Sequence, residues 1–235
     1  KNEVKVVLTG EGGDELFGGY GGYRNKTKDF LSRGTFNKFN RLQKYLCGWN
    51  FSIEFVKENI RNKKLTKLQK AQFFDFEEWL PNDLLIKLDR CLMAHGIEGR
   101  TPFVDIDIFK NLFLVDDKIK INNGMGKLYI RNFLKENLSF FNSFEKKAGF
   151  TVPLTLWLPK YKIFFSEVLP KIKCLKTIFP EHEIKNLCLS LGKNKNSITV
   201  IWRLIFFALW HDANVGYNVV EGNTFDILVT LSNMN

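Results

Sequence analysis

The amino-acid sequence predicts a mainly helical chain with one buried, parallel-type strand near its N-terminus. The strand prediction rests on the largely apolar segment Val4–Leu8, which leads directly into a glycine-rich turn. Apolar runs of this kind are typical of strands in parallel sheets that are covered on both faces. The helical prediction rests on apolar residues that recur at helical spacing through much of the remaining chain. Because a buried strand needs neighbours and no second strand is predicted nearby, we expect sequence outside these 235 residues to complete the sheet.

The segments between residues 49 and 96 are predicted to be helical. Residues 49–79 are rich in Lys and Phe and are expected to form one or two amphipathic helices. A further helix is predicted to begin at Pro81 and to end at Gly96, because Gly is the usual residue just beyond a helix C-terminus. Its apolar face is expected to lie in the core and comprises Leu84, Leu85, Leu88, Cys91, Leu92 and His95.

The remaining segments alternate between loops and helices. Residues 97–105 combine acids, a base and a Pro and are predicted to form a loop. Further along the chain, Gly124–Lys127 lead into an amphipathic helix predicted over residues 128–138. Residues 200–210 are apolar on all sides and predict a buried helix. Residues 215–235 show no periodicity and are expected to form a loosely structured tail.

Composition and charge argue against several classes of protein. The formal net charge is +10, with 35 basic and 25 acidic residues, but the lysines are spread along the whole chain. A solvated basic surface is therefore favoured over a nucleic-acid groove. The four cysteines form no C-x-x-C pair, so neither a zinc site nor a disulfide framework is indicated.

No segment of the sequence predicts export or membrane insertion. The first residues are charged and are not followed by an apolar run of signal-peptide length. The longest apolar run, Leu204–Trp210, is much shorter than the roughly 20 residues that span a bilayer. We therefore expect a soluble, cytoplasmic protein that has neither a membrane nor a nucleic acid as its partner.

The turn after the first strand is the strongest candidate for a functional site. It reads TGEGGDELFGGY from Thr9 to Tyr20, with five glycines around three carboxylates. Gly accepts positive φ and lets the backbone approach a ligand closely. Phosphate cradles usually pair their glycines with Lys or a helix N-terminus, so three acids favour a metal bridge or polar work beside a phosphate.

Four stretches of the sequence follow one another in this order: VVLTGEGGDELFGGY from Val6, LPNDLLIKLDRCLMAHGIEGRTPFVD from Leu80, GKLYIRNFLKENL from Gly126 and KKAGFTVPLTLWL from Lys146. Together they resemble the C-terminal synthetase domain of glutamine-dependent asparagine synthetases. A late helix, WRLIFFALWHD from Trp202, is also similar to the end of that domain. The resemblance implies that residues 1–214 are the C-terminal helical part of an α/β domain of the ATP-pyrophosphatase type (adenine nucleotide α-hydrolase-like).

Two parts of such enzymes do not occur in the sequence. One is the N-terminal glutaminase domain with its cysteine nucleophile, and the other is the SGGxDS pyrophosphate loop on the first strand of the synthetase domain. We therefore expect a fragment that is inactive alone and that needs a missing N-terminal half, supplied upstream or by a partner chain. Without the loop, ATP would lack the groups that hold and orient its leaving pyrophosphate.

The resemblance implies a reaction and a role for each matching residue. Aspartate and ATP would form β-aspartyl-AMP and pyrophosphate, and ammonia from the missing glutaminase domain would then give asparagine. Lys147 and Glu11 would be catalytic, the lysine by stabilising charge on the phosphates. Asp14 would hold Mg²⁺, which prefers oxygen ligands. Thr9, Gly10, Glu11 and Gly12 would contact the nucleotide and the intermediate.

Further residues have more evenly balanced interpretations. By resemblance Asp89, Glu98, Arg100 and Tyr20 would position the substrate, whereas the structural alternative for Glu98 and Arg100 is an ion pair. The acids of the turn could instead cap a helix, and Lys147 could be a solvated surface lysine. Two other functions stay open: a related acyl-adenylating amidotransferase with a different acceptor, or a non-catalytic helical fragment or accessory subunit.

Overall fold

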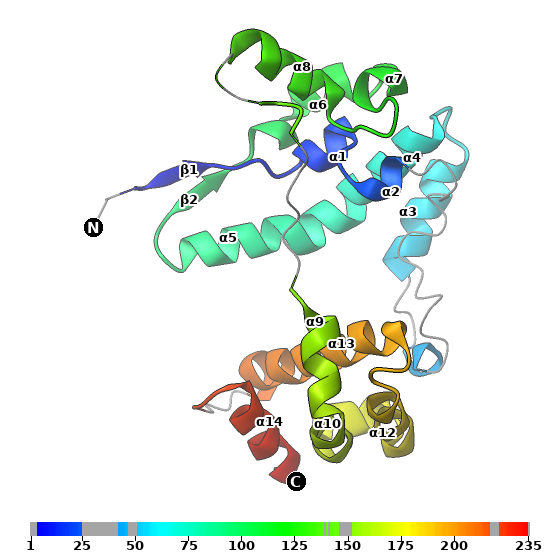
Figure 1. Ribbon diagram of the computed structural model, residues 1–235, viewed down its shortest axis with the longest axis vertical. Coiled ribbons are helices and arrows are strands. Elements are labelled where there is room, and N and C mark those ends of the chain that lie inside the picture. The colour runs from blue at the N-terminus through cyan, green and yellow to red at the C-terminus, as the bar shows by residue number, and fades with distance from the viewer. Residues whose placement is uncertain are drawn as a thin grey trace. The chain divides into compact units, whose positions relative to one another are not determined.

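The computed structural model describes seven ranges of the chain. They are residues 4–24, 42–46, 51–138, 140, 142–145, 152–216 and 221–234. Within these ranges helices dominate (Figure 1). The chain divides into two compact units, the first formed by Lys1–Thr35 with Trp49–Lys147 and the second by Phe36–Gly48 with Ala148–Asn235.

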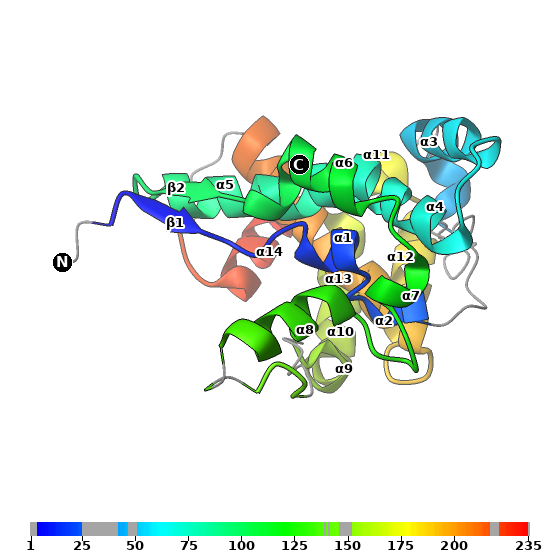
Figure 2. The ribbon, with the colours of Figure 1, turned by 90° about the horizontal axis from the view of Figure 1, so that it is seen from above.

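The first unit contains a parallel pair of short strands. β1 (Val6–Leu8) lies beside β2 (Glu98–Arg100), with Val7 opposite Gly99 (Figure 2). The parallel type of the first strand is confirmed, but the prediction of a single strand and of a loop at residues 98–100 was wrong. The pairing is made by backbone groups, with the Thr9 N–H donating to the Arg100 carbonyl at 2.8 Å, so the polar side chains of β2 do not prevent it.

The prediction that β1 is a buried strand was also wrong for the described residues. Val6 is 40% exposed and Leu8 is 72% exposed. A two-stranded sheet pairs only one edge of β1 and leaves its side chains without a covering layer, which accounts for this exposure.

Helices make up the rest of the first unit. The two helices that cover most of residues 51–74 confirm the prediction for residues 49–79. The helices and helical segments are α1 (Gly13–Phe17), α2 (Gly21–Arg24), α3 (Phe51–Arg61), α4 (Lys67–Phe74), η3 (Asp75–Leu85), α5 (Ile86–Met93), α6 (Ile106–Leu112), α7 (Asp117–Lys120) and α8 (Leu128–Asn137).

The helix predicted to begin at Pro81 in fact continues without a break from α4. Pro81 lies inside η3, whose turns are of the wider π type. A proline ring clashes with the carbonyl four residues before it in an ordinary α-helix, and wider turns move that carbonyl away. The predicted end is confirmed, since Gly96 follows α5 with φ +67°.

The apolar face of α5 is less covered than its spacing suggested. None of the α5 residues is buried, and Cys91 and His95 are exposed, so the expectation of a core His95 was wrong. Leu88 and Leu92 contact β2, because a Cβ atom on Gly99 would lie only 2.7 Å from Leu92 Cδ1. The remaining apolar positions have no second layer of the described chain above them.

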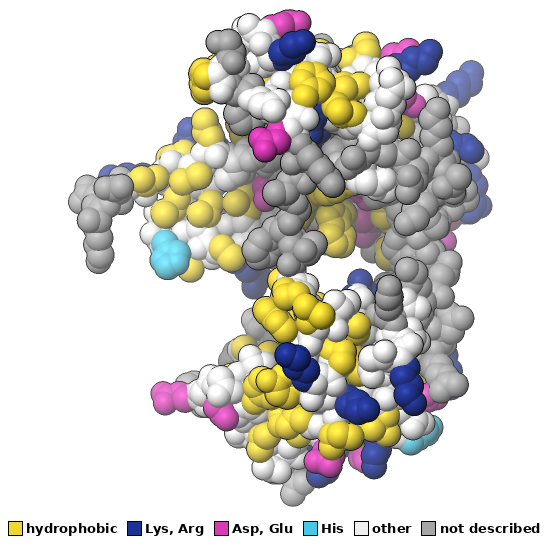
Figure 3. Space-filling view, viewed as in Figure 1, with side chains coloured by type: hydrophobic (Ala, Val, Ile, Leu, Met, Phe, Trp, Pro, Cys, Tyr) yellow, Lys and Arg dark blue, Asp and Glu magenta, His cyan; other side chains and the backbone are white. Residues whose placement is uncertain are grey.

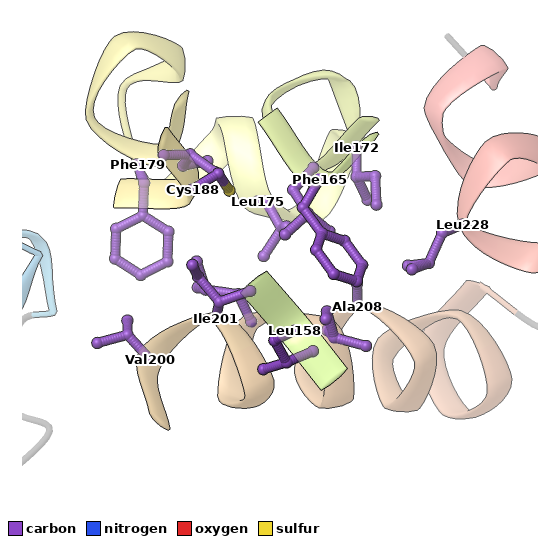
Figure 4. Close-up of a cluster of buried hydrophobic side chains, with 14 of the residues drawn as sticks. Leu158, Phe165, Ile172, Leu175, Phe179, Cys188, Val200, Ile201, Ala208 and Leu228 are labelled. Atoms are coloured by element: carbon purple, nitrogen blue, oxygen red, sulfur yellow. The ribbon is translucent and has the colours of Figure 1, made fainter. Parts of the chain in front are cut away.

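The second unit is a helical bundle around one apolar core. Figure 4 shows Ile201 and Ala208 of α13 facing Phe165 and Leu175, and all four belong to one buried cluster. The predicted helix at residues 200–210 is confirmed, although one face with Trp202 and Phe206 is exposed. The α-helices of the second unit are α9 (Leu154–Trp157), α10 (Lys162–Val168), α11 (Lys173–Ile178), α12 (Glu181–Leu189), α13 (Lys195–His211) and α14 (Thr224–Asn233). No helix in the described ranges has the length and apolarity needed to cross a membrane.

The structure differs from the expected loose tail at α14. Leu228 is fully buried and Leu231 is 6% exposed, and both belong to the core of the second unit. The short helix escaped prediction because its apolar residues cover little more than two turns and gain their burial only from the neighbouring helices.

The N-cap of α14 allows a direct test of this packing. The Asn223 side chain accepts hydrogen bonds from the N–H groups of Phe225 and Asp226, and Asp226 bonds back to Asn223. Asn223→Ala should therefore lower the free energy of unfolding of the second unit by about 1 kcal/mol in urea titrations. Thr230→Ala removes a hydroxyl that donates to the Asp226 carbonyl, a backbone group of the same helix, and should change this free energy by less than about 0.5 kcal/mol. Equal effects of the two substitutions would argue against a docked α14.

Candidate functional site

The glycine-rich turn connects β1 to α1 and is closed by its own backbone. The Leu16 N–H donates to the Gly12 carbonyl at 2.8 Å, and the Gly13 N–H donates to the Gly10 carbonyl at 3.2 Å. Gly12 has φ +84°, and a Cβ atom there would lie 2.7 Å from Val104 Cγ2. Conformation and space therefore both require glycine at position 12.

The beginning of the turn is accessible. Gly10 is exposed, and a Cβ atom on it would meet nothing within 4 Å. Glu11 is half-buried. The Thr9 hydroxyl is buried and has no hydrogen-bond partner among the described residues. The end of β1 therefore offers open backbone to a ligand at Gly10, with a buried Thr9 hydroxyl beside it.

Asp14 on α1 forms an ion pair with Lys127, the N-cap residue of α8. The Lys127 Nζ lies 3.1 Å from Asp14 Oδ1, and both side chains are largely buried. A Cβ atom on Gly19 would overlap Asp14 Oδ1 and lie 2.5 Å from Lys127 Cε, so glycine at position 19 makes room for the pair. The Lys127 N–H also donates to the Phe17 carbonyl at 3.0 Å, which ties the start of α8 to α1.

Lys127 is not among the site residues predicted from the sequence. A signal was present, because Lys127 follows Gly124-Met125-Gly126 in the sequence, much as Lys147 stands close to Gly149 and Pro153. Lys127 has φ +59°, one of two positive values among the described non-glycine residues. The carboxylate that it contacts belongs to a distant segment and cannot be inferred from spacing.

Tyr20 has an internal partner. Its hydroxyl donates to Glu15 Oε1 at 2.6 Å, and Glu15 is 1% exposed. Burial raises the pKa of Glu15, while the hydrogen bond from Tyr20 opposes part of that rise. Burial and the nearby Glu15 also raise the pKa of Tyr20, so this hydroxyl keeps its proton. The geometry thus gives Tyr20 a role in holding the turn.

Two buried polar residues, Gln72 and Lys120, form hydrogen bonds that connect α1 to α4 and α7. Gln72 of α4 donates from Nε2 to the carbonyls of Glu15 and Leu16, the latter at 2.8 Å. Lys120 of α7 donates from Nζ to Gln72 Oε1 at 3.1 Å and to the Phe113 carbonyl at 2.6 Å. Burial lowers the pKa of Lys120 to about 8. Neither residue was identified from the sequence, where nothing distinguishes them from surface side chains.

The remaining predicted positions lie elsewhere or outside the described residues. Glu98 and Arg100 form an exposed ion pair on β2, with Arg100 Nε 2.9 Å from Glu98 Oε1. An ion pair was the structural alternative to a role of these two residues in positioning the substrate. Asp89 is exposed on α5. Lys147 lies outside the described ranges. The structure thus joins Thr9 to Arg100 through a backbone hydrogen bond, and it gives Asp14 a lysine neighbour that was not predicted.

The donor set can be compared with the needs of a Mg²⁺ ion. Within the described ranges, no group of three or more His, Cys, Asp or Glu side chains is placed to hold a metal. Mg²⁺ bound to nucleotides usually takes one or two protein carboxylates together with phosphate oxygens. Asp14 fits that requirement only when a phosphate-bearing ligand supplies further oxygens. The adjacent Lys127 ammonium is a second group suited to the same phosphates.

A pocket of about 550 Å³ belongs to the second unit and contains none of the predicted site residues. Its lining includes Cys174, His211 and Asp212. Burial raises the pKa of Cys174, and the nearby Asp212 adds to the rise. Because the thiolate is the reactive form of cysteine, this arrangement does not support a cysteine nucleophile.

Comparisons with known proteins agree on one family. A family model described as asparagine synthase matches residues 1–212. Asparagine synthetase (glutamine-hydrolyzing) 1 of Bacillus subtilis (strain 168) is 25% identical over 264 residues, which cover 92% of this chain and 41% of the relative. Sequences of Mycobacterium bovis and Mycobacterium tuberculosis (H37Rv) that are named as asparagine synthetases are also 25% identical, over 94% of this chain and 41% of each relative. The chain thus spans about two fifths of these relatives, and no solved structure matches it significantly.

Proposed function

Because this chain belongs to the asparagine synthase family, we propose that it supplies one side of the ATP-dependent site of a glutamine-dependent asparagine synthetase. The reaction converts aspartate and ATP to β-aspartyl-AMP and pyrophosphate, and ammonia released from glutamine then gives asparagine. The observation that carries the proposal is the Asp14–Lys127 pair at 3.1 Å beside a glycine-rich turn. A carboxylate and an ammonium group held together suit a phosphate and its divalent cation.

Each residue of the turn has a proposed task. Asp14 holds Mg²⁺, which when bound neutralises charge on the phosphates. Lys127 exchanges its contact with Asp14 for phosphate oxygens, and Lys147 supplies a further positive charge where negative charge develops. Glu11 orients the acyl-adenylate or accepts a proton from the attacking ammonia. Thr9, Gly10 and Gly12 present a hydroxyl and open backbone to the nucleotide.

The other side of the site is proposed to come from sequence outside these 235 residues. No S-G-G-x-D stretch occurs in them, so the pyrophosphate loop of the family must be supplied separately. Among the described residues β1 pairs along one edge only, and Val4, Val6 and Leu8 are exposed. Figure 3 shows hydrophobic side chains gathered over this sheet and α5. Further strands added to β1, together with the crossover helices that cover the faces of a parallel sheet, would bury these residues and bring the missing loop beside the turn.

Pyrophosphate release tests the proposal. The chain is mixed with ATP, Mg²⁺, aspartate and ammonia, alone and together with the segment of the Bacillus subtilis relative that the match leaves uncovered. We expect release only in the second mixture, and we expect it to require aspartate. A folded chain that gives no aspartate-dependent pyrophosphate in either mixture would contradict the proposal. Release with a different carboxylic acid, and not with aspartate, would instead identify another acceptor.

Asp14→Asn should lower pyrophosphate release in the complemented mixture at least about tenfold, because it removes the charge proposed to hold Mg²⁺. Asp107→Asn is the matched control, since Asp107 is an exposed acid of α6 that pairs with Lys110 on the surface. Its rate should stay within about twofold of the unsubstituted chain. Equal rates for the two variants would argue against a role for Asp14.

A further inference from the structure

We propose that Gln72 and Lys120 are positioning residues that hold Asp14 and Lys127 together through a buried hydrogen-bonded strut. The inference rests on the proposed function only for the importance of the Asp14–Lys127 pair, because the strut itself is defined by contacts. Gln72 is fully buried on α4, and Lys120 is 1% exposed on α7. The hydrogen bonds of Gln72 and Lys120 connect three helices that are separate in the sequence, namely α1, α4 and α7. We call this connection the strut.

Gln72 supplies hydrogen bonds that the carbonyl groups of α1 cannot obtain within their own helix. A helix leaves its last four carbonyls without intrahelical partners, and α1 has only five residues, Gly13–Phe17. The Asp14 carbonyl accepts from the Gly19 N–H and the Phe17 carbonyl from the Lys127 N–H. The two between them, on Glu15 and Leu16, both accept from Gln72 Nε2. Gln72 thus completes the hydrogen bonding of the helix that carries Asp14.

The ammonium group of Lys120 is buried and donates a hydrogen bond to Gln72. Burying a charged group is unfavourable unless hydrogen bonds compensate for the lost water. Lys120 Nζ donates to Gln72 Oε1 and to the Phe113 carbonyl, and it lies 5.3 Å from the centroid of the Phe113 ring. An apolar side chain would fill the same space without this cost. A role that needs the hydrogen bond to Gln72 explains the lysine.

A short segment of the chain connects Lys120, at the end of α7, to Lys127, just before α8. α7 ends at Lys120, and a tight turn follows in which the N–H groups of Asn122 and Met125 each donate to the other's carbonyl, at 3.1 and 2.9 Å. Lys127, the N-cap residue of α8, follows this turn and Gly126 directly. Lys120 therefore anchors the segment that presents the Lys127 side chain. Gln72 is the common partner of that anchor and of α1.

Amide hydrogen exchange tests the strut without any assay of activity. The exchange is followed by mass spectrometry in peptides that cover residues 10–20 and 120–128. Gln72→Met removes both the donor to α1 and the acceptor for Lys120, so both peptides should exchange at least about tenfold faster. Gln72→Glu keeps an acceptor for Lys120 and loses the donor to α1, so only residues 10–20 should exchange faster. This difference between two variants at one position is not expected from general destabilisation.

Lys57→Met is the matched control. Lys57 is a buried lysine of α3, 3% exposed, whose ion pair is with Glu54 of the same helix. Its substitution should leave both peptides at the rate of the unsubstituted chain. Folded Gln72 variants with unchanged exchange in both peptides would overturn the proposal. Equal acceleration of both peptides by Gln72→Met and Gln72→Glu, or by Lys57→Met, would overturn it as well, whatever the outcome of the pyrophosphate assay.

Discussion

Replacing Gly126 by alanine should lower the free energy of unfolding of the first unit by about 3 kcal/mol. A Cβ atom at this position would overlap the Gly18 carbonyl oxygen and lie 3.1 Å from the Gly18 carbonyl carbon. These are backbone atoms at the end of α1, where Gly18 has φ +71°, and they cannot rotate away as a flexible side chain would. The segment before α8 must therefore move away from α1. Urea titration followed by circular dichroism measures the loss.

The same movement should separate Lys127 from Asp14, because Lys127 is the next residue. Gly126→Ala is therefore expected to lower pyrophosphate release in the complemented mixture as well. Gly21→Ala is the matched control, since Gly21 is exposed and a Cβ atom there would meet nothing within 4 Å. It should change the unfolding free energy by less than about 0.5 kcal/mol. A similar small effect of Gly126→Ala would show that α1 and the start of α8 are not in this close contact.

Lys120→Met should change how the stability of the first unit depends on pH. Burial lowers the pKa of Lys120 from 10.5 to about 8, and the nearby Asp117 offsets part of this. Between these two values the unfolded chain binds a proton that the folded chain does not, so stability rises with pH. The penalty is complete below about pH 8 and disappears by about pH 10.5. Relative to Lys120→Met, the unsubstituted chain should therefore gain about 3 kcal/mol from pH ~7 to pH ~10.5.

Urea titrations at several pH values measure this difference. Ile119→Met is the control, because Ile119 is a half-exposed neighbour on α7 that carries no titratable group. Its unfolding free energy should run parallel to that of the unsubstituted chain over the same range. Parallel curves for Lys120→Met would mean that the Lys120 ammonium is as well solvated in the folded chain as in the unfolded chain.

Local features of both units could be predicted because they depend on neighbouring residues. The apolar segment before Gly10 predicted the strand and its parallel type, and the helical spacing predicted α3, α4, α8 and α13. The conformational need for glycine at position 12 is likewise local, since positive φ is a property of that residue alone. The second strand was missed because Glu98–Arg100 pairs through its backbone, which side-chain patterns do not report.

The sequence by itself determined the family and the composition of the turn, from Thr9 to Asp14, because motifs of this kind lie in one continuous stretch. Only the tertiary structure decided which groups surround the turn. Gln72 lies 56 residues from Leu16 and 48 from Lys120, and the ion pair joins Asp14 to a residue of a different helix. Such contacts depend on how helices pack around a shared core. Packing satisfies the buried carbonyls of α1 with whichever donors it brings near, and no local spacing records that outcome.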